Sequence, residues 1–267
     1  MSASGDDPRY PVQAPGWAAL DQALGMIHPG QTPHQFASQR AYDLEGRAPL
    51  PAISVYEGQG PAHWHFVTYG LTELFDKSSP DPERSGFGFE LTLRLPRSVG
   101  ESMPPTWALE LMQTLGHFVL SGHGPLDSGH IIDLGGPLVP PSPPEAGEQA
   151  GEQAGEQAGE QAGRADPGAK AKGQSEARSS ALQGVICVPD PQLGKLDTPF
   201  GSVLFLQLFG LTRDELELMG EWSLERKVGL VREAYPPLAI TDPARESMRE
   251  DRRKLTVFRR YELGILI

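Results

Sequence analysis

The stretch PAHWHFVTYGLTELFDKSSPDPERSGFGFELTLRL (61–95) decides the fold of this chain. Residues 64–69 are largely apolar, and every second residue is apolar from Phe87 to Leu95. Because successive side chains of a strand point to opposite faces, this alternation predicts a strand with one apolar face. The polar residues of its other face are Glu90, Thr92 and Arg94. Two core strands, joined by a polar loop that contains prolines, are therefore expected.

The remaining sequence alternates between helix and strand patterns. Helices are predicted at 17–27, 104–120 and 224–234, and further strands at 53–56, 203–209 and 238–240. Thr212 is followed three residues later by Glu215, which is the capping-box spacing that starts a helix. Helices and strands interleave, but short loops join several strand pairs. This organisation predicts an α+β domain with a mixed sheet flanked by helices.

The composition changes abruptly after residue 137. PLVPPSPP is rich in proline, and GEQA then repeats four times from Gly147 to Ala162. Such a segment buries too little apolar surface to offset its chain entropy. We interpret 140–183 as a disordered insertion within one domain at 13–267, and 1–12 as a flexible N-terminus.

Charge and cysteine usage restrict the environment and the partners. The net charge of −12 disfavours nucleic acids and favours basic partners. We interpret the basic residues at 245–260, which mingle with acids, as a solvated helix face. The sequence contains neither a secretory signal nor an apolar run long enough to span a membrane. The single cysteine, Cys187, lies in an apolar run, so a buried reduced thiol and a cytoplasmic location are expected.

Two histidines form the most ligand-like pair of the chain. His63 and His65 flank Trp64 on a predicted strand, so both imidazoles point to the same face and could share a metal. The candidates for a third ligand are His123, His130 and Asp133. The chain has no HExxH motif and no paired CxxC motif. We therefore favour structural histidines, and a metal-dependent enzyme stays as an alternative.

Nucleophilic catalysis finds little support in the sequence. There is no GxSxG motif, and Cys187 lies in an apolar strand, where a thiolate is disfavoured. Gly86 and Gly88 begin a strand, so we interpret them as sites of close backbone approach or of a bulge. The sequence predicts no enzyme and no cofactor.

Four blocks, in the same order, resemble the Suppressor of Fused family. They are 61–95, PPTWALELMQTLGHFV (104–119), TPFGSVLFLQLFGLTRDEL (198–216) and PLAITDPAR (237–245). The resemblance is to the N-terminal domain and implies its fold. Animal members sequester a zinc-finger transcription factor by gripping a short peptide between this domain and a second one. The resemblance to stand-alone, bacterial-type members implies an immunity protein that neutralises a toxin.

The resemblance also implies a partner-binding site in the loop DKSSPDPER (76–84). In animal members the corresponding loop helps to form the peptide-binding surface, with an aromatic and acidic residues. Phe75 stands near the aromatic position, and Asp81 is the acid nearest to the peptide-contacting aspartate. The predicted partner-binding residues are Phe75, Asp76, Asp81 and Glu83. An ordinary polar turn, restricted by its two prolines, is the alternative interpretation.

The sequence thus predicts a non-enzymatic domain that binds a protein, plausibly a basic toxin, through long-range steering. The first alternative is a regulatory adaptor that binds an extended peptide by strand addition. The second is a metal-dependent enzyme that uses His63 and His65.

Overall fold

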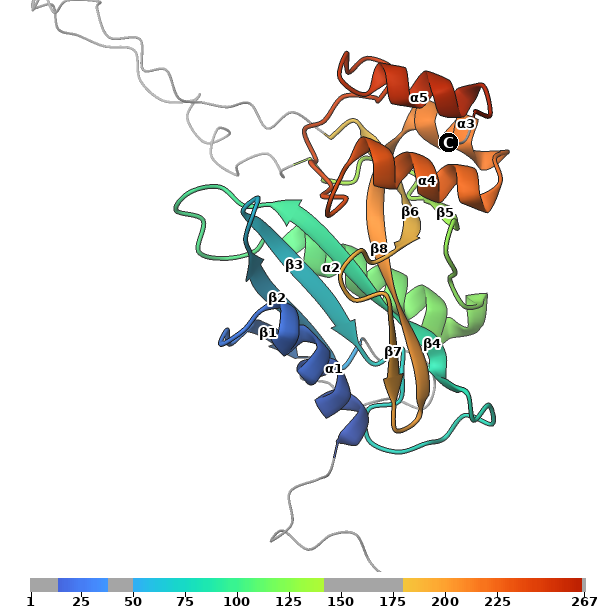
Figure 1. Ribbon diagram of the computed structural model, residues 1–267. Helices are drawn as coiled ribbons and strands as arrows, with labels where there is room; N and C mark the ends of the chain where they lie inside the picture. The colour runs from blue at the N-terminus through green and yellow to red at the C-terminus, as the bar shows by residue number, and fades with distance from the viewer. Residues whose placement is uncertain (1–13, 38–49, 142–179, 266–267) are drawn as a thin grey trace, which may run out of the picture.

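The computed structural model describes residues 14–37, 50–141 and 180–265. Within them an eight-stranded sheet has the order β1-β2-β3-β4-β8-β6-β5, and β7 pairs with β8 (Figure 1). The strands are β1 (His34–Ala37), β2 (Ala52–Gly58), β3 (His63–Tyr69), β4 (Arg84–Pro96), β5 (Ile131–Asp133), β6 (Leu182–Pro189), β7 (Lys195–Thr198) and β8 (Gly201–Thr212). The helices are α1 (Pro15–Ile27), α2 (Thr106–Phe118), a π-helical turn η1 (Val119–His123), α3 (Arg213–Gly220), α4 (Leu224–Ala234) and α5 (Leu255–Glu262).

Strand pairing confirms the predicted mixed sheet. β4 and β8 run parallel, whereas β3 pairs antiparallel with β4 and β6 pairs antiparallel with β8. The predicted flexible segment 1–12 and most of the predicted insertion 140–183 lie outside the described residues. Leu182 and Gln183 belong to β6, so this strand begins before the end predicted for the insertion.

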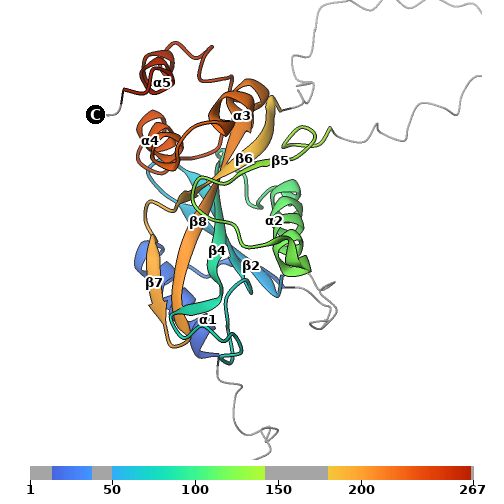
Figure 2. The ribbon, with the colours of Figure 1, turned by 90° about the vertical axis from the view of Figure 1, so that its right-hand side faces the viewer.

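Helices cover the sheet on both faces (Figure 2). α2 packs on one face, where the predicted apolar side of β4 contributes Phe89, Leu91, Leu93 and Leu95 to the main core. α1 packs on the opposite face with Val67, Tyr69 and Phe205. α3, α4 and α5 pack together at the end of β6 and β8. Both faces of the central strands are therefore buried, including the face that the sequence marks as polar.

Several local predictions can be compared directly with the structure. The Thr212–Glu215 capping box is confirmed at the start of α3. The predicted strand at 238–240 is wrong, because Ala239 has a φ of 48° and the carbonyls of Leu238 and Ala239 accept hydrogen bonds from Gln207 Nε2 at 2.8 and 2.6 Å. The side chain of Gln207 therefore makes the hydrogen bonds that a neighbouring strand would make to residues 238 and 239.

The basic region contains a further correction. Arg245 is buried, and its guanidinium donates to Glu215 and to the carbonyl of Gly210. The interpretation of this region as a solvated helix face is therefore wrong for Arg245. Among the described helices, none is long and apolar enough to cross a membrane.

Candidate functional site

The four predicted partner-binding residues lie on the loop that connects β3 to β4. Phe75 is an exposed aromatic, with 45% of its surface accessible. Asp76, Asp81 and Glu83 are exposed as well. The structure thus brings an aromatic ring and three carboxylates onto one short segment at the surface.

The N-terminus of α1 contacts the loop at Leu74 and Phe75. The backbone amides of Gly16 and Trp17 donate to the carbonyl of Leu74 at 3.1 and 3.2 Å. The ring of Trp17 lies 4.7 Å from that of Tyr69 and 6.5 Å from that of Phe75, measured between centroids. Trp17 therefore extends the aromatic surface of the loop. Its place in the apolar stripe of a predicted helix gave no sign of this second contact.

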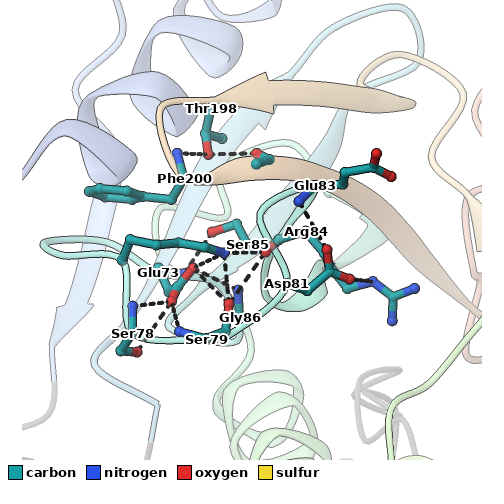
Figure 3. Close-up of polar contacts among 12 residues, drawn as sticks. Glu73, Ser78, Ser79, Asp81, Glu83, Arg84, Ser85, Gly86, Thr198 and Phe200 are labelled. Atoms are coloured by element: carbon teal, nitrogen blue, oxygen red, sulfur yellow. Dashed lines mark hydrogen bonds and ion pairs between the residues drawn. The ribbon is translucent and has the colours of Figure 1, made fainter.

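The acidic residues at the end of the loop are only partly engaged (Figure 3). Asp81 accepts a hydrogen bond from the backbone amide of Glu83 at 2.9 Å, and its Oδ2 lies 3.9 Å from Nε of Arg84. More than half of each side chain in the Asp81–Arg84 pair is exposed, so the pair contributes little to stability. The carbonyl of Glu83 accepts from the amide and the hydroxyl of Ser202 in β8, at 2.8 and 2.9 Å. Its carboxylate points away from the loop in Figure 3.

Glu73, which the sequence did not single out, stands near the start of the loop, and the rest of the loop folds around its carboxylate. Its carboxylate accepts hydrogen bonds from the backbone amides of Ser78, Ser79 and Gly86 and from Nζ of Lys77. Burial opposes ionisation, but these donors outweigh it and lower the pKa of Glu73 to about 2. Glu73 is therefore a charged structural anchor at neutral pH.

A second carboxyl, Glu90, lies under the start of the loop. It is fully buried and accepts from the hydroxyls of Thr68 and Thr72 and from the amides of Gly70 and Thr72 at 2.6–3.0 Å. Burial without a cationic contact raises the pKa of Glu90 to about 7, although these hydrogen bonds oppose the shift. The backbone of Gly86 lies close to that of Leu71. Gly86 has a φ of 55°, and a Cβ on it would lie 2.8 Å from the carbonyl oxygen of Leu71. Close backbone approach at Gly86 is confirmed, and the pairing register of β4 with β8 shifts between Arg84 and Phe89.

His63 and His65 point to the same face of β3, with ring centroids 6.5 Å apart. Nδ1 of His65 lies 2.9 Å from Nε2 of His28, and its Nε2 lies 3.6 Å from Oδ2 of Asp190. Asp190 also accepts from Arg94, with 3.1 Å between Oδ1 and Nη2. These side chains form a buried polar cluster, hereafter the Arg94–Asp190 cluster. The sequence placed His28 beside a turn, which concealed its burial.

The electrostatics of the Arg94–Asp190 cluster favour a structural role. Burial and the nearby Arg94 guanidinium lower the pKa of His65 to about 3, so its imidazole is neutral at neutral pH. Burial opposes ionisation of Asp190, but contacts with His65 and Arg94 hold its pKa well below the ordinary value. In the part of the chain that the structure describes, no three His, Cys, Asp or Glu side chains could hold a metal together.

The proposed third ligands lie away from this pair of histidines. Asp133 belongs to β5, at the far end of the sheet from β3, and His130 directly precedes that strand. His123 belongs to η1, and its Nδ1 lies 3.2 Å from the carbonyl oxygen of Phe118. The structure therefore does not bring the candidate ligands of the alternative metal site together.

A comparison with protein families decides the relationship. The family described as Suppressor of fused protein (SUFU) matches residues 46–246. The chain belongs to the Suppressor of Fused family. The human Suppressor of fused homolog is 31% identical over 245 residues, which cover 86% of this chain and 43% of the human protein. The chain therefore spans less than half the length of this relative.

Solved structures confirm the fold. A chain in the crystal structure of the Sufu–Fu complex matches with a TM-score of 0.70 and 25% identity, covering 96% of this chain and 99% of that one. Drosophila Suppressor of Fused matches with a TM-score of 0.70 and 26% identity, covering 97% of this chain and 56% of that one. The predicted resemblance and the predicted α+β class are both confirmed.

Proposed function

We propose that this Suppressor of Fused domain is a non-enzymatic protein-binding domain that sequesters or neutralises a partner protein, in the manner of an immunity protein. One observation carries the proposal: a loop built around a buried carboxylate exposes Phe75 beside Asp76, Asp81 and Glu83. A similar chain was solved in the crystal structure of the Sufu–Fu complex, which supports a role in protein binding.

The chemistry of the loop favours a basic partner. An aromatic ring supplies contact area at low entropic cost, and neighbouring carboxylates accept charge-assisted hydrogen bonds from arginine, lysine or protonated histidine. Asp81 can exchange Arg84 for a cation of the partner at little cost, because their pair is exposed. The net charge of −12 steers a basic protein towards this surface at low salt.

The buried reactive groups support the absence of enzymatic activity. Burial raises the pKa of the Cys187 thiol to about 12, which disfavours the nucleophilic thiolate. His65 lies between His28 and Asp190 in the interior, and both histidines are buried. A buried, reduced cysteine is consistent with a cytoplasmic location, which we include in the proposal.

A second candidate function is a regulatory adaptor that binds an extended peptide by strand addition. β1 covers β2 only as far as Val55, and the side-chain amide of Gln31 pairs with the backbone of Glu57 beyond it. A hollow of about 330 Å³ adjoins this edge of the sheet. A peptide that displaced Gln31 would gain the two main-chain hydrogen bonds of Glu57.

Affinity capture from the native lysate tests the leading proposal. Wild-type protein and the variants Phe75→Ala and Asp81→Asn are used as baits at low and at high salt. Met103→Ala, which removes another exposed apolar side chain, is the matched control. We expect one basic protein that wild type and Met103→Ala retain and that is lost with Phe75→Ala or at high salt. Equal recovery by wild type and Phe75→Ala would refute this binding site.

A further inference from the structure

The segment from Glu73 to Gly86 closes on itself around the largely buried carboxylate of Glu73, which pairs with Lys77. Nζ of Lys77 lies 2.9 Å from Oε2 of Glu73, and only 7% of the Glu73 side chain is exposed. The same ammonium donates to Oγ of Ser79 and to the carbonyl of Arg84. Lys77 therefore joins the entry of the loop at Glu73 to its exit at Arg84.

Glu73 divides its donors between its two carboxylate oxygens. Oε1 accepts from the amides of Ser78 and Ser79, whereas Oε2 accepts from Lys77 and from the amide of Gly86 at 3.1 Å. Its own amide donates to Oγ of Ser85 at 3.0 Å. A carboxylate satisfies donors on both oxygens, which a neutral amide cannot do.

The two ends of the loop are fixed by the rest of the domain. At the entry, α1 holds Leu74, and a Cβ on Gly16 would lie 2.1 Å from the carbonyl oxygen of Glu73. At the exit, β8 holds Glu83 through Ser202. Between these ends, the carboxylate of Glu73 and the ammonium of Lys77 make hydrogen bonds to Ser78, Ser79, Arg84 and Gly86.

We propose that Glu73 and Lys77 are positioning residues, which fix the loop in the conformation that presents Phe75 and Asp81 before a partner arrives. The inference rests on the proposed function. Each backbone residue that must be ordered on binding costs about 1–2 kcal/mol, so a preformed loop avoids a large part of that cost. Loss of the Glu73–Lys77 pair therefore weakens binding even though neither residue has to touch the partner.

The decisive variant is Glu73→Gln. In either orientation of the new amide, its NH₂ group faces two donors: Lys77 and Gly86 on one side, or Ser78 and Ser79 on the other. Lys77→Met removes the ammonium and keeps an unbranched side chain of similar length, whereas Lys77→Arg keeps the positive charge. Glu101→Gln is the matched control, because Glu101 accepts from the amide of Ser98 in a different loop.

Hydrogen exchange measures how well Glu73 protects the amides of the loop, and it needs no partner. We expect either the amides of Ser78 and Ser79 or the amide of Gly86 to exchange at least about tenfold faster in Glu73→Gln, because the new NH₂ group leaves one of these two sets without an acceptor. The amides of Gly70 and Thr72, which donate to Glu90, should keep their wild-type rates. Unchanged exchange at Ser78, Ser79 and Gly86 would overturn the inference.

Binding is then measured with the protein captured by the wild-type domain. We expect Glu73→Gln and Lys77→Met to bind about tenfold more weakly, with Lys77→Arg close to wild type and Glu101→Gln unchanged. Wild-type affinity in Glu73→Gln, combined with lost binding in Phe75→Ala, would overturn the positioning role alone. Unchanged binding in Phe75→Ala would overturn the proposed site, and faster exchange in Glu73→Gln would then show a structural role only.

Discussion

Asp190 is the residue whose loss should most clearly reveal how the sheet is held together. Its carboxylate accepts from Arg94, from the hydroxyl of Thr92 at 2.8 Å, and from the amides of Gln192 and Leu193 at 2.9 and 3.0 Å. Asp190→Asn removes the negative charge and leaves the buried Arg94 guanidinium without its counter-ion. The change in volume is negligible, so the variant isolates the charge.

The expected loss can be estimated from the burial of the pair. The side chains of Arg94 and Asp190 are both inaccessible to solvent. Removal of one partner from such a pair costs roughly 3–5 kcal/mol, because the remaining charge stays desolvated. With a urea dependence of roughly 2–3 kcal/mol per molar, the unfolding midpoint should fall by about 1–2.5 M.

Urea unfolding, followed by tryptophan fluorescence at neutral pH, measures this loss. Asp76→Asn is the matched control, because Asp76 is exposed, and its midpoint should stay at the wild-type value. The pKa of Asp190 is depressed in the fold, so its contribution is present above the unfolded value of 3.8 and is lost as the pH falls through the folded value. The difference between wild type and Asp190→Asn should therefore shrink below about pH 4. A loss under about 1 kcal/mol at pH 7 would refute the reasoning.

Two further predictions concern the base of the loop. The folded pKa of Glu90, about 7, lies above the ordinary value of 4.5, so its contribution to the free energy of unfolding is fully present below pH 4.5 and is lost as the pH rises through 7. Glu90→Gln should remove that loss, which is worth up to roughly 3 kcal/mol, and urea unfolding of both proteins from pH 4 to pH 8 measures the difference. Gly86→Ala should destabilise the domain by about 2 kcal/mol, because Gly86 has a φ of 55° and its new Cβ would meet the backbone of Leu71. Calorimetry should show a lower Tm, with Gly100→Ala, which has a positive φ but open space around it, as the control; equal losses in both variants would exclude the contact with Leu71.

The local patterns of the sequence predicted the frame of the fold correctly. The alternation from Phe87 to Leu95 depends only on strand geometry, and the predicted apolar face lies in the main core, against α2. The capping box at Thr212 is equally local, since its two partners are three residues apart. The loop with Phe75 and Asp81 could be placed because the family resemblance indicated it.

The buried polar face of the sheet could not be predicted in the same way. Arg94 and Asp190 are 96 residues apart, and they meet because β4 and β6, which ends at Pro189, both pair with β8. A polar residue at every second position is also what an exposed face would show. Glu73 was missed for another reason: three of its donors are backbone amides, which leave no trace in residue type.

The central claim is that Phe75 and the neighbouring acids bind a protein partner. The most direct measurement is the dissociation constant of the captured partner for wild type, Phe75→Ala and Met103→Ala, determined at two salt concentrations. We expect Phe75→Ala to weaken binding by at least about tenfold while its Tm stays near that of wild type, and Met103→Ala to bind normally. Equal affinities for all three proteins, with no dependence on salt, would contradict the account.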